Sequence, residues 1–254
     1  MLKRICFVAA FCMIFSCASK KEILYLQDVD ENANKDILYS NAKIQPNDVL
    51  RINISALNPE SAIPYNVTPR NSNAGSVQLL QLDGYLVSEN LTINFPILGV
   101  LSVENKTTQE FAAYLKDLLE SNNHLKNPAV DVRLVNAKVT ILGEVNSPGT
   151  YNFTEQNITL LQALGYAGDL TINGKREDIL VMREEDGVRQ ITHIDLTTSE
   201  WLNGPYNFVK PNDVIVVNPN NPKVKSSGFV GNVGTLISVI SIVFSTIVII
   251  TNVK

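Results

Sequence analysis

Short stretches in the middle of the chain alternate hydrophobic and polar residues, a pattern typical of strands with one buried face. Residues 49–54 alternate in this way directly after a Pro-Asn turn. Thr107 and Glu110 have the spacing of a capping box, and apolar residues then recur at helical spacing. Further strand-like stretches lie at residues 77–82, 93–98 and 129–135. Together these elements predict a compact α+β unit over residues 38–135.

A second set of elements follows without a linker and predicts another unit over residues 136–220. Its strand-like stretches are residues 139–145, 150–153, 179–183, 188–194 and 214–217. Thr159 and Gln162 form a second capping box, which opens a helix between the second and third strands. A further short helix is expected through Trp201. The order strand, strand, helix, strand, strand is that of a β-grasp fold.

One turn sequence occurs in both units, as IQPNDVL at residues 44–50 and as VKPNDVI at residues 209–215. Proline sets φ for the turn, asparagine tolerates the left-handed region, and aspartate can bond the neighbouring backbone. The pattern favours two structural turns, and a ligand-binding role is the alternative. The residues concerned are Pro46, Asn47, Asp48, Pro211, Asn212 and Asp213.

The chain begins with the pattern of a secretory signal peptide. Two basic residues precede an apolar run over residues 5–15, which is too short to span a bilayer comfortably. A small residue and then Cys17 follow, which resembles the lipoprotein box of bacteria, and Ala18 is compatible with transfer to the outer membrane. We expect a signal peptide over residues 1–16, lipidation of Cys17 and a polar tether over residues 17–37. An ordinary signal peptide with a chance cysteine is the alternative.

The C-terminal region contains 23 uncharged residues, 229–251, after a linker over residues 221–228. A helix of that length reaches about 35 Å, enough to cross the hydrocarbon core of a membrane. Small hydroxyl residues would share one of its faces: Thr235, Ser238, Ser241 and Ser245. Such a face usually marks helix–helix contact, and in a ring of helices it could line a wet lumen. A simple single-helix anchor is the alternative.

The composition of the chain excludes several classes of function. The chain has 254 residues, of which 45% are hydrophobic and 18% charged, so it is not a disordered chain. Its net charge is -4, and the sequence shows no basic stripe of the kind that binds nucleic acid. Two histidines and three cysteines leave little material for a metal site, and no glycine-rich phosphate loop follows a strand. We therefore predict no metal, no cofactor and no enzymatic activity.

Several motifs occur in order along most of the chain. The first unit has Tyr39 ahead of its Pro-Asn-Asp turn, then Asn94-Phe95-Pro96-Ile97-Leu98-Gly99, then Asn127-Pro128-Ala129-Val130-Asp131-Val132. The second unit has Gly143-Glu144-Val145, then Pro148-Gly149-Thr150-Tyr151, and later Ala167-Gly168. Their turn residues include Pro96, Gly99, Pro148 and Gly149. With these motifs the chain resembles the outer-membrane polysaccharide export lipoprotein family.

This resemblance implies an α+β protein in which a polysaccharide export domain precedes one soluble-ligand-binding β-grasp (SLBB) domain, with a C-terminal transmembrane helix. It implies a homo-oligomeric ring of about eight subunits, closed by rotational symmetry. The lipid would sit in the outer membrane, the two domains in the periplasm, and the C-terminal helix across the membrane. Capsular polysaccharide or exopolysaccharide would pass through, delivered by an inner-membrane copolymerase. The alternative is a membrane-tethered periplasmic scaffold that binds a glycan or a partner protein.

The chain departs from the family pattern at a few turns. Asn47 and Asn212 stand where the family usually has glycine, a mild change because asparagine accepts positive φ. Asp169 follows Gly168 where a second glycine is common. These departures concern loop shape rather than the fold.

Overall fold

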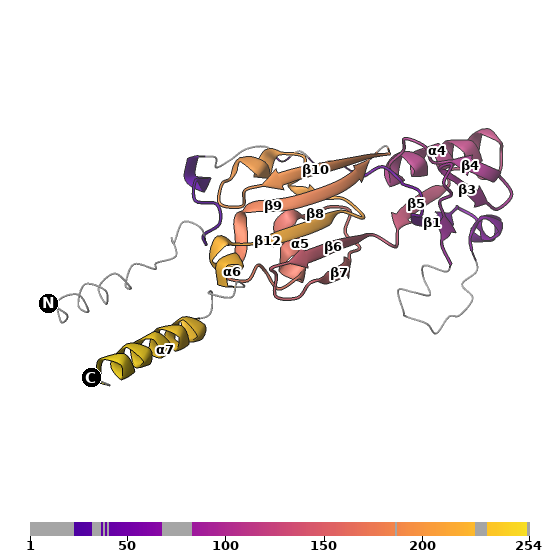
Figure 1. Cartoon of the computed structure of the whole chain (residues 1–254). Coiled ribbons are helices and arrows are strands. Elements are labelled where there is room, and N and C mark those ends of the chain that lie inside the picture. Colours follow the sequence, from indigo (N-terminus) through magenta and orange to yellow (C-terminus); the bar gives the residue numbers. More distant parts are fainter. Residues whose placement is uncertain are drawn as a thin grey trace.

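The computed structural model describes residues 23–31, 37, 39, 41–67, 83–185, 187–226 and 233–252 (Figure 1). Two α+β units follow one another, each with its own cluster of buried apolar side chains. Several predicted features lie outside the described residues. These are the signal peptide 1–16, the lipidation site Cys17 and the strand-like stretch 77–82.

The first unit is built on a three-stranded antiparallel sheet with the order β2-β1-β5. Its elements are β1 (Val49–Ser55), α2 (Pro59–Ala62), η3 (Ile63–Tyr65), β2 (Tyr85–Leu86), β3 (Thr92–Phe95), β4 (Gly99–Ser102), α4 (Thr108–Ser121) and β5 (Ala129–Leu134). Every second residue of β1 is buried, as the alternation predicted. The predicted capping box is confirmed, because Thr107 accepts from the Glu110 amide and Glu110 accepts from the Thr107 amide. Helix α4 then buries one face.

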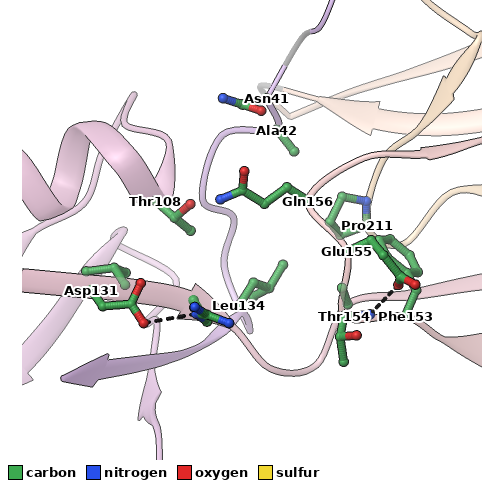
Figure 2. A pocket seen from close by; sticks show the side chains of 13 residues that line it. Asn41, Ala42, Thr108, Asp131, Leu134, Phe153, Thr154, Glu155, Gln156 and Pro211 are labelled. Carbon is green, nitrogen blue, oxygen red and sulfur yellow. Dashed lines mark hydrogen bonds and ion pairs between the residues drawn. The ribbon is translucent and has the colours of Figure 1, made fainter.

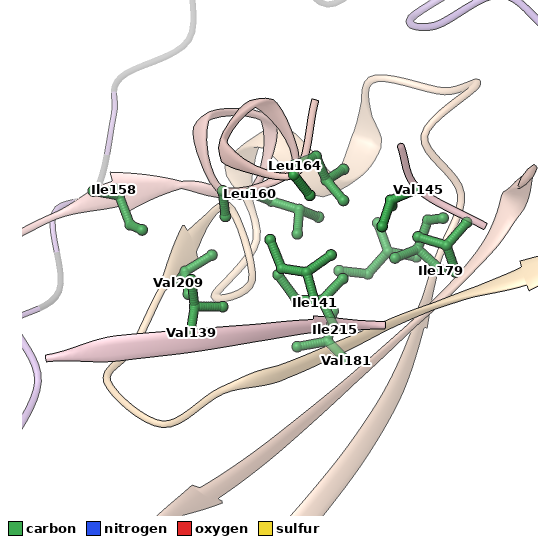
Figure 3. Close-up of a cluster of buried hydrophobic side chains, with 14 of the residues drawn as sticks. Val139, Ile141, Val145, Ile158, Leu160, Leu164, Ile179, Val181, Val209 and Ile215 are labelled. Atoms are coloured by element: carbon green, nitrogen blue, oxygen red, sulfur yellow. The ribbon is translucent and has the colours of Figure 1, made fainter. Parts of the chain in front are cut away.

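The second unit is a five-stranded mixed sheet with the order β10-β9-β12-β6-β7. Its elements are β6 (Lys138–Gly143), β7 (Gly149–Asn152), β8 (Ile158–Thr159), α5 (Leu160–Tyr166), β9 (Gly174–Glu185), β10 (Val188–Ile194), η4 (Glu200–Asn203), β11 (Phe208–Val209) and β12 (Val214–Pro219). The first and last strands, β6 and β12, pair in parallel at the centre, and every other pair is antiparallel. Figure 3 shows α5 across this sheet, with the apolar side chains between them. This is the β-grasp arrangement that the order of elements predicts.

Several elements differ from the prediction. Strand β9 begins five residues before the expected start at Ile179, and the helix through Trp201 is the 3-10 helix η4. A short helix, α6 (Asn221–Ser226), lies within the expected linker. Part of the expected tether, residues 23–31, packs on the second unit and includes the 3-10 helix η2 (Val29–Glu31). These pieces lack the periodicity from which longer elements are predicted.

The C-terminal region contains helix α7 (Val233–Asn252). Within the part of the chain that the structure describes, no helix combines the length and apolar character needed to cross a membrane. The transmembrane helix expected over residues 229–251 is therefore not shown and stays a prediction.

The end of β6 approaches the backbone of β12 at Gly143. This glycine has a φ of 89°, and a Cβ atom there would lie 2.0 Å from the carbonyl oxygen of Val217. The next amide, that of Glu144, donates to the same oxygen at 2.9 Å. The parallel pairing at the centre of the sheet therefore requires glycine at this position.

We predict that Gly143→Ala lowers the free energy of unfolding by about 3 kcal/mol or more, because it adds both backbone strain and a clash. Trp201, the single tryptophan of the chain, is buried in the same unit and reports its unfolding by fluorescence in urea. The matched control is Gly165→Ala in α5, where a Cβ atom meets nothing within 4 Å. That change should raise stability by about 0.5–1 kcal/mol. Equal effects of the two substitutions would contradict the prediction.

Candidate functional site

The two Pro-Asn-Asp turns have the same backbone geometry. Asn47 and Asn212 both have a φ of 68°. Asp48 accepts a hydrogen bond from the Gln45 amide at 2.8 Å, and Asp213 accepts one from the Lys210 amide at 2.9 Å. Each aspartate closes its turn through the backbone three residues earlier, which is a structural role.

The second turn carries a buried ion pair. Arg183, on β9, donates from Nη2 to Asp213 Oδ2 at 2.7 Å and from Nε to Oδ1 at 3.0 Å. Nη1 also donates to the Pro205 carbonyl and Nη2 to the Phe208 carbonyl. Both charged side chains are less than 5% exposed. Burial raises the pKa of Asp213, and the contact with Arg183 opposes that rise.

The first turn buries its carboxylate without such a partner. Asp48 is 3% exposed, and within the described residues no cationic side chain bonds to it. Burial raises the pKa of Asp48 to about 6, although the hydrogen bond from the Gln45 amide lowers it. The same local turn thus carries a paired charge in one unit and a proton-sensitive group in the other.

The first turn also lies at the junction between the two units. Asn136, in the connection after β5, accepts from the Val49 amide at 2.8 Å and donates to the Asn47 carbonyl at 2.9 Å. The Gln45 side chain donates to the Glu184 carbonyl at the end of β9. Leu134 packs against the apolar clusters of both units. Tyr39, ahead of β1, stacks on Phe208 of β11. The junction therefore combines a few apolar contacts with several amide hydrogen bonds.

A cavity of about 270 Å³ opens at this junction (Figure 2). Amide side chains from three segments form a chain of hydrogen bonds there. Asn157 donates to Asn41 at 3.3 Å, and Asn41 donates to Gln109 of α4 at 3.0 Å. Gln109 in turn donates to Gln156 at 3.4 Å. The chain of amides links the segment before β1, helix α4 and the loop after β7.

The charged groups that line the cavity are already engaged locally. Asp131 pairs with Arg133 at 2.9 Å, and Glu155 accepts from the Thr154 amide. The cavity thus offers amide and hydroxyl groups, which suit hydrogen bonds to neutral polar ligands such as sugars. Within the described residues, no cluster of three or more His, Cys, Asp or Glu side chains could hold a metal ion.

The predicted site residues are spread over the molecule. Of the turn residues, only Pro211 lines the junction cavity. Pro96 and Gly99 lie in the β3–β4 hairpin, Pro148 lies between β6 and β7, and Gly149 is the first residue of β7. Ser238, Ser241 and Ser245 lie on α7 and are exposed, and Ser238 donates to the Gly234 carbonyl. Cys17 and the side chain of Thr235 lie outside what the structure describes.

Sequence reasoning missed Arg183, Asn136 and the four amides of the junction. The sequence contains one indication that Arg183 is buried and paired, because it occupies an inward position of β9 in alternation with Ile179 and Val181. A charged residue on the buried face of a strand predicts a buried partner. Asn136 and the amides have no such pattern.

Two parts of the chain match known protein families. Residues 38–135 match the description "Polysaccharide biosynthesis/export protein", and residues 138–192 match the SLBB domain. The chain belongs to the polysaccharide export family. The first α+β unit is accordingly a polysaccharide export domain and the β-grasp unit an SLBB domain. Members of this family are transport components rather than enzymes.

Two curated relatives carry the same printed name, "EPS I polysaccharide export outer membrane protein EpsA". The protein from Ralstonia solanacearum is 25% identical over 199 residues, which cover 74% of this chain and 52% of the relative. The protein from Ralstonia nicotianae is 32% identical over 108 residues, which cover 40% of this chain and 27% of the relative. The chain thus spans about half the length of the first relative.

We predict that Asp48 makes the polysaccharide export domain less stable as the pH rises from about 4 to about 6. The pKa of Asp48 in the folded state lies above its unfolded value of 3.8, so the folded state binds the proton more tightly. The stabilisation that protonation gives the folded state is therefore lost as the pH rises and Asp48 ionises. Asp48→Asn keeps the acceptor for Gln45 and removes the charge. The unfolding free energies of the two proteins, followed by circular dichroism, should therefore diverge by about 2–3 kcal/mol across this range.

The comparison variant is Asp213→Asn. It leaves the Arg183 charge buried and unpaired, so it should cost about 3–5 kcal/mol at neutral pH. A difference between wild type and Asp48→Asn that does not change with pH would contradict the assignment of the proton to Asp48.

Proposed function

We propose that this protein is an outer-membrane lipoprotein that forms an oligomeric channel for the export of capsular polysaccharide or exopolysaccharide. The observation that carries the proposal is the polysaccharide export domain followed directly by an SLBB domain. A relative that matches across both domains is named a polysaccharide export outer membrane protein. The resemblance further supports a ring of about eight copies that works with an inner-membrane copolymerase.

The exposed surface of α7 supports a membrane role for the C-terminal helix. Eight large apolar side chains in its described part are between 43% and 65% exposed: Ile237, Val239, Ile240, Ile242, Val243, Phe244, Val248 and Ile249. A continuous apolar surface of this kind needs lipid or protein around it. In the proposal, residues 229–251 cross the outer membrane beside the same helix of neighbouring copies, with the serine face at the helix contacts.

The course of the chain supports one orientation of the domains. Ile23 lines the same pocket as Asn221 and Pro222 at the start of α6. The segment that leads from Cys17 and the segment that leads to α7 therefore meet at one side of the SLBB domain. With acylated Cys17 and α7 both in the outer membrane, the SLBB domain lies next to that membrane. The polysaccharide export domain then faces the periplasm and the copolymerase.

The junction cavity favours a second candidate function. Its amide and hydroxyl lining could hold part of a glycan, as expected of a membrane-tethered binding module. Such a module would work as a monomer or dimer, and its loss would leave surface polysaccharide intact.

We predict that the full-length protein, extracted in detergent, has a native mass that is a single large multiple of the monomer mass. A deletion strain should lose surface polysaccharide. A version truncated after Lys225 tests where the contacts lie, because a ring that survives truncation is held by the periplasmic domains. A monomeric full-length protein together with normal surface polysaccharide in the deletion strain would favour the binding module instead.

We also predict that the triple substitution Ser238→Leu, Ser241→Leu and Ser245→Leu misplaces the protein or disturbs its assembly. Leucine widens the face on which the helices would meet, and it makes retention in the inner membrane during export more favourable. Membrane fractionation and native mass measure the two effects. The matched control replaces the same serines by alanine, which keeps the face small. Normal location and export in the leucine variant would count against the helical barrel.

A further inference from the structure

Part of the expected tether makes specific contacts with the SLBB domain. The Leu26 amide donates to the Leu196 carbonyl at 3.1 Å, and the Gln27 amide donates to the Thr197 carbonyl at 2.7 Å. The side chains of Tyr25 and Leu26 pack against the apolar cluster of the domain. Two backbone hydrogen bonds and two packed side chains are more than a flexible spacer needs.

Tyr25 makes two further contacts through different parts of its side chain. Its hydroxyl donates to Asp169 Oδ1 at 2.5 Å, and its ring lies over the Arg176 guanidinium, with 5.1 Å from Cζ to the ring centre. The phenol side chain therefore interacts favourably with both charges, through a hydrogen bond to the carboxylate and a cation–π contact with the guanidinium.

Arg176, beneath the Tyr25 ring, is a buried cation. It is only 6% exposed, and its Nη1 atom donates to the Thr171 and Gly174 carbonyls. Its Nε atom makes no hydrogen bond to any described residue. No salt bridge joins Arg176 to a carboxylate within the described residues, and the Tyr25 ring supplies a cation–π contact to the buried guanidinium.

Asp169 occupies a backbone position that does not favour it. Its φ is 70°, in the region where glycine is free of strain. The neighbouring Gly168 also has a positive φ, of 72°. The Asp169 carboxylate receives the Tyr25 hydroxyl and the Leu170 amide. An aspartate at this position therefore adds backbone strain that glycine would avoid, but it supplies the carboxylate that binds the Tyr25 hydroxyl.

We propose that residues 169–176 and 195–197 of the SLBB domain form a docking surface for the N-terminal segment of the same chain, with Tyr25 as the recognised side chain. With residues 23–31 docked, residues 17–22 are the part of the chain that separates Cys17 from the SLBB domain. Six residues reach about 20 Å when fully extended, so they hold Cys17 close to the side of the domain where α6 begins. The consequence for a lipid on Cys17 rests on the proposed function, whereas the docking itself does not.

Hydrogen exchange measured on the full-length protein in detergent tests the docking. The amides of Leu26 and Gln27 should be protected in the wild type. Tyr25→Ala should make them exchange about tenfold faster or more, since it removes a hydrogen bond to a charged group and a packed ring. Asp169→Gly should act in the same direction, while the glycine relieves the backbone. Tyr25→Phe, which keeps the ring over Arg176, should have a smaller effect.

Val29→Ala is the matched control, because Val29 belongs to the same segment and is 42% exposed. It should leave the exchange of Leu26 and Gln27 unchanged. Amides in the core of the sheet, such as those of Ile141 and Val181, should keep their protection in every variant. Unprotected Leu26 and Gln27 amides in the wild type, or unchanged protection in both Tyr25→Ala and Asp169→Gly, would overturn the docking. Neither result depends on acylation or on polysaccharide, so the export proposal stands or falls separately.

Discussion

The buried pair of Arg183 and Asp213 is the interaction on which the arrangement of the SLBB domain depends. One guanidinium joins β9, the turn before β12, and the Pro205 and Phe208 carbonyls. Because breaking a buried pair leaves an uncompensated charge, these segments are held in one geometry. Phe208 is thereby fixed where Tyr39 stacks on it at 5.2 Å, and the Pro211 turn is fixed beside the junction cavity. The position of the export domain's leading segment thus depends on a charge pair inside its neighbour.

The two copies of the Pro-Asn-Asp turn share one backbone geometry, but their aspartates contribute differently to stability. Both copies place an asparagine at positive φ and close the turn with an aspartate, since three residues of sequence suffice for that. What each aspartate contributes to stability depends on residues far along the chain. Asp213 meets an arginine 30 residues away, whereas Asp48 lies in a turn that Asn136 holds through the Asn47 carbonyl and the Val49 amide. The sequence motif is shared, but the electrostatics are not.

Sequence reasoning reached the elements with a strong local pattern. The alternation in β1 and the two capping boxes at Thr107 and Thr159 act within a few residues, so they could be predicted. The candidate site could not, because its contacts join distant positions through side chains without periodicity. Asn157 and Asn41, for example, are 116 residues apart. The docked segment was missed for the same reason: its amides pair with a loop far along the chain, and its short apolar run, residues 23–26, has neither strand nor helix periodicity and lies between polar residues.

The contrast between cores and junction bears on how an export ring could hold its shape. Each domain buries its own large apolar cluster, whereas the described contacts at the junction are Leu134, the stack of Tyr39 on Phe208 and amide hydrogen bonds. A hydrogen bond of this kind contributes only about 1 kcal/mol net. Changing the angle between the domains therefore costs far less free energy than disrupting either apolar core. In the proposed ring, contacts between neighbouring copies would then set that angle. A polar, adjustable junction suits the proposed ring, since each domain could remain rigid while the copies assemble.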